Sequence, residues 1–454
     1  LFDSFDADKE KKDVPAVPPS VVPTQTRLSF EFPLESRAIS EFYPGTPGEK
    51  VKANIAAIRV AKKLTDENRL ATVDEQQVLS RYVGWGGLAN NFFDESNPRY
   101  SELREELKTL VTEHEYSNML QSSLTAYYTS PEVIQTMYKH LNHLGFKGGR
   151  VLDPSMGTGN FFASMPGSLK NNSDLYGVEL DAITGQIATN LQQTSQVQIK
   201  GFQDTNFNDN ALDLVTTNVP FGQIMIGDEK YSRNYAIHDY FIKKSLDLVH
   251  EGGLVAVITS TATMDKTDSR FREEIAKQAN LVSAVRLPND AFKNIAGTDV
   301  SSDILIFQKT STSERKPDWI NTYNLSDDMG NRVSINRYFH EHPEFVLGQV
   351  GIKTFNGGVL TVKRDFEEEQ YIPQLAEALD KQSDAAYYSH NKSEELIESF
   401  GAEEYSLPSE VLEAQEPFTL FVYNGKPYFY DGKHVVPHYK QSCLLYTSPS
   451  PRDP

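Results

Sequence analysis

Seven short apolar runs alternate with helical stretches through the middle of the chain. The runs lie at 151–152, 175–178, 197–199, 212–216, 254–258, 281–287 and 304–307, with helical spacing of apolar residues at 183–191, 237–249 and 270–278. Such alternation is typical of an α/β fold with a mainly parallel sheet that helices cover on both faces. The last two runs are joined without a clear helix, which predicts a seven-stranded sheet whose last strand is antiparallel.

The two flanks of this region differ from it in pattern. The N-terminal flank opens with a stretch that several prolines keep from forming a helix, which predicts a disordered arm or linker. Apolar residues at helical spacing follow and predict a helical N-terminal region. Behind the sheet region the pattern weakens, and we expect a small C-terminal α+β region that ends in alternating strand-like residues with two glycine turns.

These patterns predict six segments. The last of them resembles a translated sequencing adapter, so we expect a non-native tail and a parent protein longer than these 454 residues. The predicted segments are a disordered arm at 1–45, a helical region at 46–125, the sheet domain at 126–312, a linker-like mixed region at 313–415, a small β-meander at 416–441 and the tail at 442–454.

Composition narrows the possible functions. No apolar run approaches the length of a membrane span and no signal peptide opens the chain, so we expect a cytoplasmic protein without a membrane partner. The single cysteine, Cys443, argues against a disulfide framework or a cysteine-rich zinc site, and no metal site is expected. The net charge of −19 argues against broad coating of nucleic acid, although a local basic groove remains compatible with it.

A glycine-rich turn follows the first apolar run. Gly157 and Gly159 permit a tight strand-to-helix turn whose backbone can approach a ligand. Glu179 ends the second run 22 residues after Gly157, where an acidic side chain in nucleoside-binding folds accepts hydrogen bonds from ribose hydroxyls. The candidate contacts in the turn are Asp153, Pro154, Ser155, Met156, Gly157, Thr158, Gly159, Asn160 and Phe161.

A second candidate loop, Asn218-Val219-Pro220-Phe221, follows the fourth run. An amide oxygen at Asn218 and a backbone carbonyl at Val219 can accept the two N–H bonds of an aromatic amine. They would draw the amine lone pair toward an electrophile by position and electrostatics, without a strong general base. Phe221 offers a ring on which a flat base could stack.

The order of these motifs resembles that of the N6-adenine class of DNA methyltransferases that use S-adenosylmethionine. The resemblance implies a Rossmann-like class I methyltransferase fold, S-adenosylmethionine in the glycine turn and adenine in DNA as the substrate. It also implies that Tyr128 and Thr129, which precede a helix start at Ser130-Pro131, close over the methionine end of the cofactor. A carboxylate after the third strand would accept from the cofactor's adenine amino group, and Asp204 is preferred slightly over Gln203 for this role.

One residue departs from the family pattern. Val219 stands where the common form, Asn-Pro-Pro followed by Tyr or Phe, has its first proline, and the exchange loosens the loop. Three hypotheses therefore stay open. They are an active N6-adenine DNA methyltransferase, a methyltransferase that acts on RNA or protein glutamine, and a catalytically weak or inactive scaffold.

Two further segments are similar to particular branches of this family. The 82–88 segment, Tyr-Val-Gly-Trp-Gly-Gly-Leu, and the Asn-Val-Pro-Phe-Gly variant resemble methylase modules of very large phage and conjugative-element proteins. The 286–309 region resembles the closing part of type I restriction-modification methylase subunits. The first resemblance implies a bacterial host, a role in protecting element DNA and a helicase-like ATPase partner domain. Because no Walker A pattern occurs in this chain, that domain would lie beyond its C-terminal end.

Overall fold

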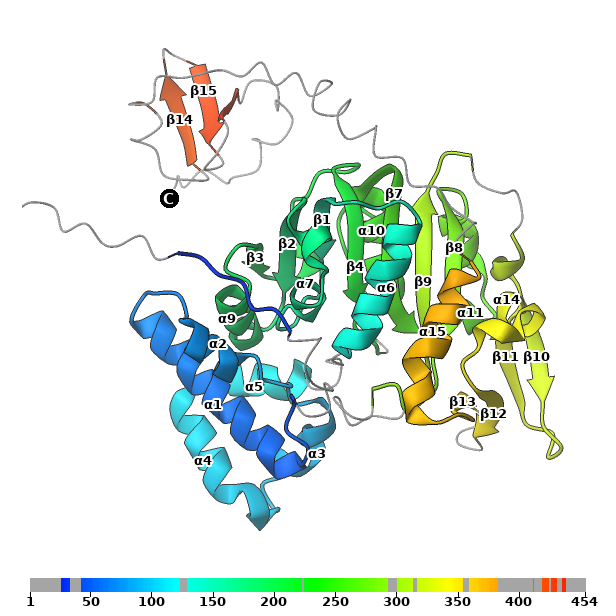
Figure 1. Cartoon of the computed structure of the whole chain (residues 1–454), viewed down its shortest axis with the longest axis horizontal. Helices are drawn as coiled ribbons and strands as arrows, with labels where there is room; N and C mark the ends of the chain where they lie inside the picture. The colour runs from blue at the N-terminus through cyan, green and yellow to red at the C-terminus, as the bar shows by residue number, and fades with distance from the viewer. Residues whose placement is uncertain are drawn as a thin grey trace, which may run out of the picture.

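A seven-stranded sheet forms the centre of the molecule (Figure 1). Its strand order is β3-β2-β1-β4-β7-β9-β8. The computed structural model describes residues 26–32, 42–122, 129–222, 224–292, 300–312, 317–353, 359–382, 411, 419–423, 426–430 and 435–437. The sheet strands are β1 (Gly149–Asp153), β2 (Ser173–Glu179), β3 (Gln196–Ile199), β4 (Leu212–Asn218), β7 (Val249–Ser260), β8 (Ala279–Arg286) and β9 (Ser302–Lys309).

The strand directions confirm the predicted fold class. The pairs β2–β3, β1–β2, β1–β4 and β4–β7 are parallel. The last strand along the chain, β9, is antiparallel to both of its neighbours, β7 and β8. The carboxyl ends of β1, β2 and β4 therefore meet at one edge of the sheet, which is where ligands bind in open α/β folds.

Burial explains why the apolar runs form these strands. The residues of β4 from Leu212 to Thr217 are all buried, and so are those of β7 from Leu254 to Thr259. A strand with both faces covered needs apolar or hydrogen-bonded residues at every position rather than at alternate ones. Continuous apolar runs were for this reason the correct signal for the central strands.

Helices surround the sheet. The helix α6 begins at the predicted N-cap Ser130, whose hydroxyl accepts from the Val133 backbone N–H at 3.4 Å. In Figure 1, α6 and α15 lie side by side in front of the strands. The remaining helices of this domain are α7 (Asn160–Ala163), α8 (Gly167–Lys170), α9 (Ala182–Leu191), α10 (Ile237–Leu248), α11 (Ala262–Asp265) and α12 (Arg270–Ile275), besides α6 (Pro131–His143) and α15 (Tyr371–Asp380).

The N-terminal helices share a second apolar core with α9. Ile183, Ile187 and Leu191 on α9 belong to this core, so the N-terminal region is packed on α9 of the sheet domain. Capping boxes begin α1 at Thr46 and α2 at Thr72. These N-terminal helices are α1 (Pro47–Asp66), α2 (Val73–Leu79), α3 (Ala89–Phe92), α4 (Ser101–Leu110) and α5 (Glu113–Ser122).

Part of the predicted N-terminal arm has a defined position. Ser29 pairs with Gln192 as an antiparallel bridge, and the Phe30 N–H donates to the Leu191 carbonyl at 2.7 Å. Phe30 and Phe32 are buried against each other with ring centroids 5.2 Å apart. Two aromatic side chains thus dock residues 26–32 on the end of α9, in a stretch that the proline pattern alone assigned to the arm.

Residues 317–353 and 359–382 also pack on the sheet domain. Their side chains Trp319, Phe339 and Leu375 belong to the same apolar core as the strands.

A buried arginine lies where these residues meet the sheet. Arg286 on β8 forms ion pairs with Asp303 on β9 and with Asp265, both at 2.8 Å. The elements here are β10 (Thr322–Ser326), β11 (Arg332–Asn336), α14 (Arg337–Glu341), β12 (Gln349–Lys353) and β13 (Val359–Lys363).

The C-terminal strands form a small antiparallel sheet in the order β14-β15-β16. They are β14 (Thr419–Tyr423), β15 (Lys426–Tyr430) and β16 (Val435–Pro437), within the predicted meander. The segment boundaries themselves stay a prediction. In the described part of the chain, no helix is both long and apolar enough to cross a membrane.

Candidate active site

The glycine turn and the Asn218 loop lie next to each other. They end β1 and β4, which pair in parallel with Val151 opposite Leu214 and Leu152 opposite Val215. The Ser155 hydroxyl, in the turn, donates to the backbone carbonyl of Asn218 at 2.8 Å. Two motifs separated by more than 60 residues therefore form one site at the carboxyl edge of the sheet.

The turn depends on its glycines. Gly157 and Gly159 have φ angles of 54° and 89°, in the left-handed region that side chains disfavour. A Cβ atom on Gly159 would lie 2.7 Å from Cγ of Gln192, which leaves no room for a larger residue. The Gly159 N–H donates to the Met156 carbonyl at 2.8 Å and closes the turn just before α7.

Glu179 fixes the other side of the turn. Its carboxylate accepts from the Gly157 N–H and from the Asp181 N–H, each at 2.9 Å. Burial raises the pKa of Glu179 to about 7 despite these hydrogen bonds. Leu180, the next residue, is 72% exposed and presents an apolar surface beside the carboxylate. No pattern in the sequence distinguishes Leu180, because an exposed leucine becomes informative only when its neighbours in space are known.

Asn218 is bound on two sides. Its side-chain Nδ2 donates to the Thr129 hydroxyl at 3.1 Å, and its backbone carbonyl accepts from Ser155. The bond to Thr129 sets the rotation of the amide, because the Nδ2 end then points to Thr129 and the Oδ1 end points elsewhere. The predicted cofactor segment and the predicted catalytic loop are thus in direct contact through Thr129. Tyr128, predicted to act beside it, lies outside the described residues.

Asp153 is deeply buried rather than open to the crevice. Its side chain is 0% exposed, and its Oδ1 lies 2.6 Å from the Thr217 hydroxyl and 3.2 Å from the Ser155 backbone nitrogen. Burial, with a smaller repulsive contribution from Glu179, raises the pKa of Asp153 to about 7. This carboxyl group therefore contacts β4, the strand that ends in the Asn218 loop.

The other residues of the Asn218 loop are partly covered. The Val219 N–H donates to the Ile258 carbonyl of β7 at 2.9 Å. Phe221 is 6% exposed and meets Phe292 edge to face, with ring centroids 6.5 Å apart. Pro220 is half-buried. A base that stacks on Phe221, as predicted, would have to displace the side chains that cover this ring.

The remaining predicted cofactor contacts fall into two groups. Most of them support the turn from inside: Pro154, Met156, Thr158, Asn160 and Phe161 are buried. Asn160 donates to the Tyr43 hydroxyl at 3.3 Å and so ties the turn to the N-terminal region.

Asp204 belongs to the second group. It lies exposed in a 3₁₀ turn after β3 and accepts from the Gln203 side chain at 3.0 Å. Both candidates for the role at this position, Asp204 and Gln203, are open to solvent, so the choice between them stays a prediction.

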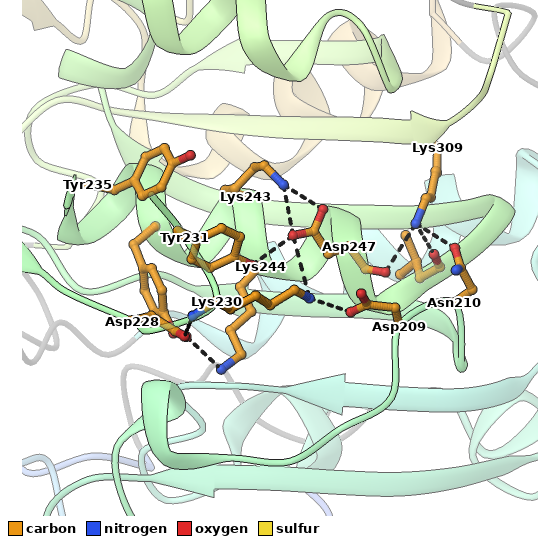
Figure 2. A network of polar contacts seen from close by, with 12 residues as sticks. Asp209, Asn210, Asp228, Lys230, Tyr231, Tyr235, Lys243, Lys244, Asp247 and Lys309 are labelled. Atoms are coloured by element: carbon orange, nitrogen blue, oxygen red, sulfur yellow. Dashed lines mark hydrogen bonds and ion pairs between the residues drawn. The ribbon is translucent and has the colours of Figure 1, made fainter. Parts of the chain in front are cut away.

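A polar network holds the segment that follows the Asn218 loop and leads to α10 (Figure 2). This chain contains the short strands β5 (Met225–Ile226) and β6 (Tyr235–Ala236), which pair with each other. The Tyr231 hydroxyl donates to Asp247 of α10 at 2.7 Å, and Lys244 of α10 pairs with Asp228 at 3.2 Å. Figure 2 shows these side chains converging from both segments, so the exit of the loop is fixed on α10. Within the described residues, no cluster of His, Cys, Asp or Glu could hold a metal ion.

Comparison with known proteins places this site in a family. A family model described as N-6 DNA Methylase matches residues 112–344, just over half of the chain. The chain belongs to the N-6 DNA methylase family. The matched span contains the glycine turn, Glu179 and the Asn218 loop, so the predicted family and class I methyltransferase fold are confirmed.

Individual relatives of this N-6 DNA methylase cover it only in part. The chain is 25% identical over 264 residues to "Defense against restriction protein B" of Escherichia phage P1, over 57% of the chain and 10% of that protein. It is 24% identical over 218 residues to the "Type I restriction enzyme EcoEI methylase subunit" of Escherichia coli, over 40% of the chain and 44% of that protein. The chain thus spans less than half the length of either relative.

Among solved structures, a type I restriction-modification methyltransferase subunit from Streptococcus thermophilus is similar with a TM-score of 0.38 and 12% identity. The similarity covers 80% of each chain.

Proposed function

We propose that this N-6 DNA methylase transfers a methyl group from S-adenosylmethionine to the N6 amino group of adenine in DNA. The main support is the contact between the glycine turn and Asn218. It brings a cofactor cradle and an acceptor for the amine to the same edge of the sheet. The family match over this span supports the same assignment.

The residues present fit S-adenosylmethionine. Gly157 and Gly159 carry no side chains and form a tight turn, the shape that holds the methionine portion of this cofactor. Glu179 offers a carboxylate to the ribose hydroxyls, and exposed Leu180 offers an apolar surface to the adenine ring next to it. When bound, S-adenosylmethionine supplies an electrophilic methyl group on a positively charged sulfur.

The chain's own residues prepare the amine. The Asn218 Oδ1 accepts one N–H bond of the target amino group, and the Val219 backbone carbonyl accepts the other. Two such bonds localise the amine lone pair and direct it toward the methyl group, which lowers the barrier through position and electrostatics. Thr129 keeps the Asn218 amide in the required orientation through its 3.1 Å hydrogen bond.

We further propose that the chain is a module of a longer mobile-element protein that modifies DNA. The similarity to the phage P1 protein, of which the chain matches only 10%, supports this proposal. A helicase-like ATPase partner domain stays a prediction.

The test is transfer of labelled methyl from S-adenosylmethionine to unmethylated duplex DNA, followed by digestion to nucleosides. We expect label in N6-methyladenine and none with the matched variant Asn218→Ala, whose cofactor affinity is measured in parallel. Low salt is used because contacts of Lys and Arg side chains to DNA phosphates weaken as the salt concentration rises. Label in RNA or in protein glutamine instead would replace adenine as the substrate, and cofactor binding without any transfer would favour the scaffold hypothesis.

A further inference from the structure

The peptide group between Asn218 and Val219 is held at both of its ends. Its carbonyl oxygen accepts from the Ser155 hydroxyl at 2.8 Å, and its N–H donates to the Ile258 carbonyl at 2.9 Å. The second bond extends the parallel pairing of β4 with β7 by one residue beyond Asn218. A proline at position 219 could not form it, since proline has no backbone N–H. The valine that departs from the family pattern thus provides a restraint of its own.

The bond from Ser155 is the end of a longer chain of contacts. The Ser155 hydroxyl lies 2.8 Å from the Thr217 hydroxyl, and the Thr217 hydroxyl lies 2.6 Å from Oδ1 of Asp153. Three oxygen-to-oxygen contacts therefore connect Asp153, through Thr217 and Ser155, to the carbonyl of Asn218. Asp153 and Thr217 are both 0% exposed, so no solvent competes for the hydrogen bond between them.

Counting hydrogens assigns the protonation state of Asp153. Each of the three contacts needs one hydrogen, whereas the hydroxyls of Thr217 and Ser155 supply only two. If Asp153 were ionised, Thr217 would donate to Asp153 and Ser155 would donate to the Asn218 carbonyl. The 2.8 Å contact between the two hydroxyls would then hold no hydrogen. If Asp153 carries a proton, it donates to Thr217, Thr217 donates to Ser155, and Ser155 donates to the Asn218 carbonyl. The neutral acid satisfies all three contacts.

The surroundings of Asp153 agree with a neutral acid. Its second oxygen, Oδ2, meets no hydrogen-bond donor among the described residues, and an ionised oxygen in that position would be costly. The titratable groups that face it are Glu179, whose charge disfavours a second one, and the buried Tyr138 hydroxyl. No cation partner to Asp153 occurs in the described part of the chain.

We propose that Asp153, Thr217 and Ser155 are positioning residues, a hydrogen-bonded chain that starts at a protonated carboxyl group and, together with Ile258, fixes the Asn218–Val219 peptide. The fixed peptide orients the Asn218 side chain and the Val219 carbonyl toward the target amine. This inference rests on the proposed function and explains how the loop keeps its geometry without the first proline of the family motif.

The experiment compares Thr217→Val with Thr217→Ser in the full chain. Valine has nearly the shape of threonine but lacks the hydroxyl that links Asp153 to Ser155. Serine keeps this hydroxyl. For Thr217→Val we expect about a tenfold slower single-turnover methyl transfer and a faster amide hydrogen exchange at Val219, with cofactor affinity unchanged within about twofold. Thr217→Ser should restore both readouts.

The outcomes separate this inference from the proposed function. If the wild-type chain transfers no methyl to DNA, the proposed function fails, and exchange at Val219 still decides whether the hydroxyl chain holds the peptide. An unchanged rate and unchanged exchange in Thr217→Val would overturn the inference. Infrared difference spectra of wild type against Asp153→Asn test the proton: a carboxylic-acid carbonyl band that the variant loses supports a neutral Asp153, and its absence overturns the assignment.

Discussion

The neutral Asp153 makes a quantitative prediction for stability against pH. Replacing Asp153 with asparagine keeps the size of the side chain and places an amide N–H where the acid proton would donate to Thr217. The variant can therefore form the same three contacts but cannot ionise, and its Nδ2 cannot accept from the Ser155 backbone N–H as Oδ1 does, a loss that does not depend on pH. The informative difference between wild type and variant is therefore how their free energies of unfolding change with pH, rather than the constant offset between them.

The magnitude follows from two pKa values. Burial raises the pKa of Asp153 from its ordinary 3.8 to about 7 in the folded chain. Because the folded-state pKa is the higher one, the stability that the neutral form contributes is complete below the unfolded-state pKa. It is lost as the pH rises toward the folded-state pKa. The change is about 1.4 kcal/mol per pH unit at most. The free energy of unfolding of wild type should therefore fall by about 2 kcal/mol relative to that of Asp153→Asn between about pH 5 and pH 7.

Urea unfolding of both proteins across this range is the assay. The difference between the two free energies removes the titrations that they share, including most of that of Glu179. The control Asp174→Asn removes an exposed carboxylate on β2 and should stay within about 0.5 kcal/mol of wild type throughout. A difference between wild type and Asp153→Asn that does not change with pH would refute the reasoning, because it would mean that Asp153 is ionised across the range.

Three further predictions follow from the site and the core. Glu179→Gln should weaken S-adenosylmethionine binding by about tenfold or more in calorimetry at a pH above the Glu179 pKa of about 7, because a charged acceptor is lost there, and an unchanged affinity would contradict the ribose assignment. Gly159→Ala should destabilise the chain by about 1–3 kcal/mol in urea unfolding, since its φ is 89° and the new Cβ would lie 2.7 Å from Gln192; an unchanged midpoint would count against the strained turn. Arg286→Met should cost about 3–5 kcal/mol because it leaves the buried carboxylate of Asp303 unpaired, and a loss below about 1 kcal/mol would show that the ion pairs contribute little.

The sequence was sufficient for the parts of the fold that depend on local pattern. Buried central strands require continuous apolar runs, and each of the seven runs lies within or overlaps a strand of the sheet. The helix start at Ser130 was equally local, because a cap depends on three or four neighbouring residues. The antiparallel β9 was predictable from a connection without a helix.

The contacts between strands could not be predicted in this way. Ser155 meets Thr217 only because β1 and β4 are adjacent in a particular register, which no local pattern specifies. The packing of residues 317–353 and 359–382 depends on a few large side chains, such as Trp319 and Phe339, within a polar stretch. Its polar average predicted a linker-like region, whereas burial of such side chains depends on partners far away in the chain.

The measurement that tests the central claim most directly is the single-turnover rate of methyl transfer from S-adenosylmethionine to adenine in duplex DNA. It compares wild type with Asn218→Ala at saturating cofactor, and cofactor affinity is measured on the same samples. We expect rapid formation of N6-methyladenine by wild type and a rate at least about a hundredfold lower in the variant, with cofactor affinity nearly unchanged. Equal rates in the two proteins would contradict the assignment of Asn218 as the residue that accepts the target amine.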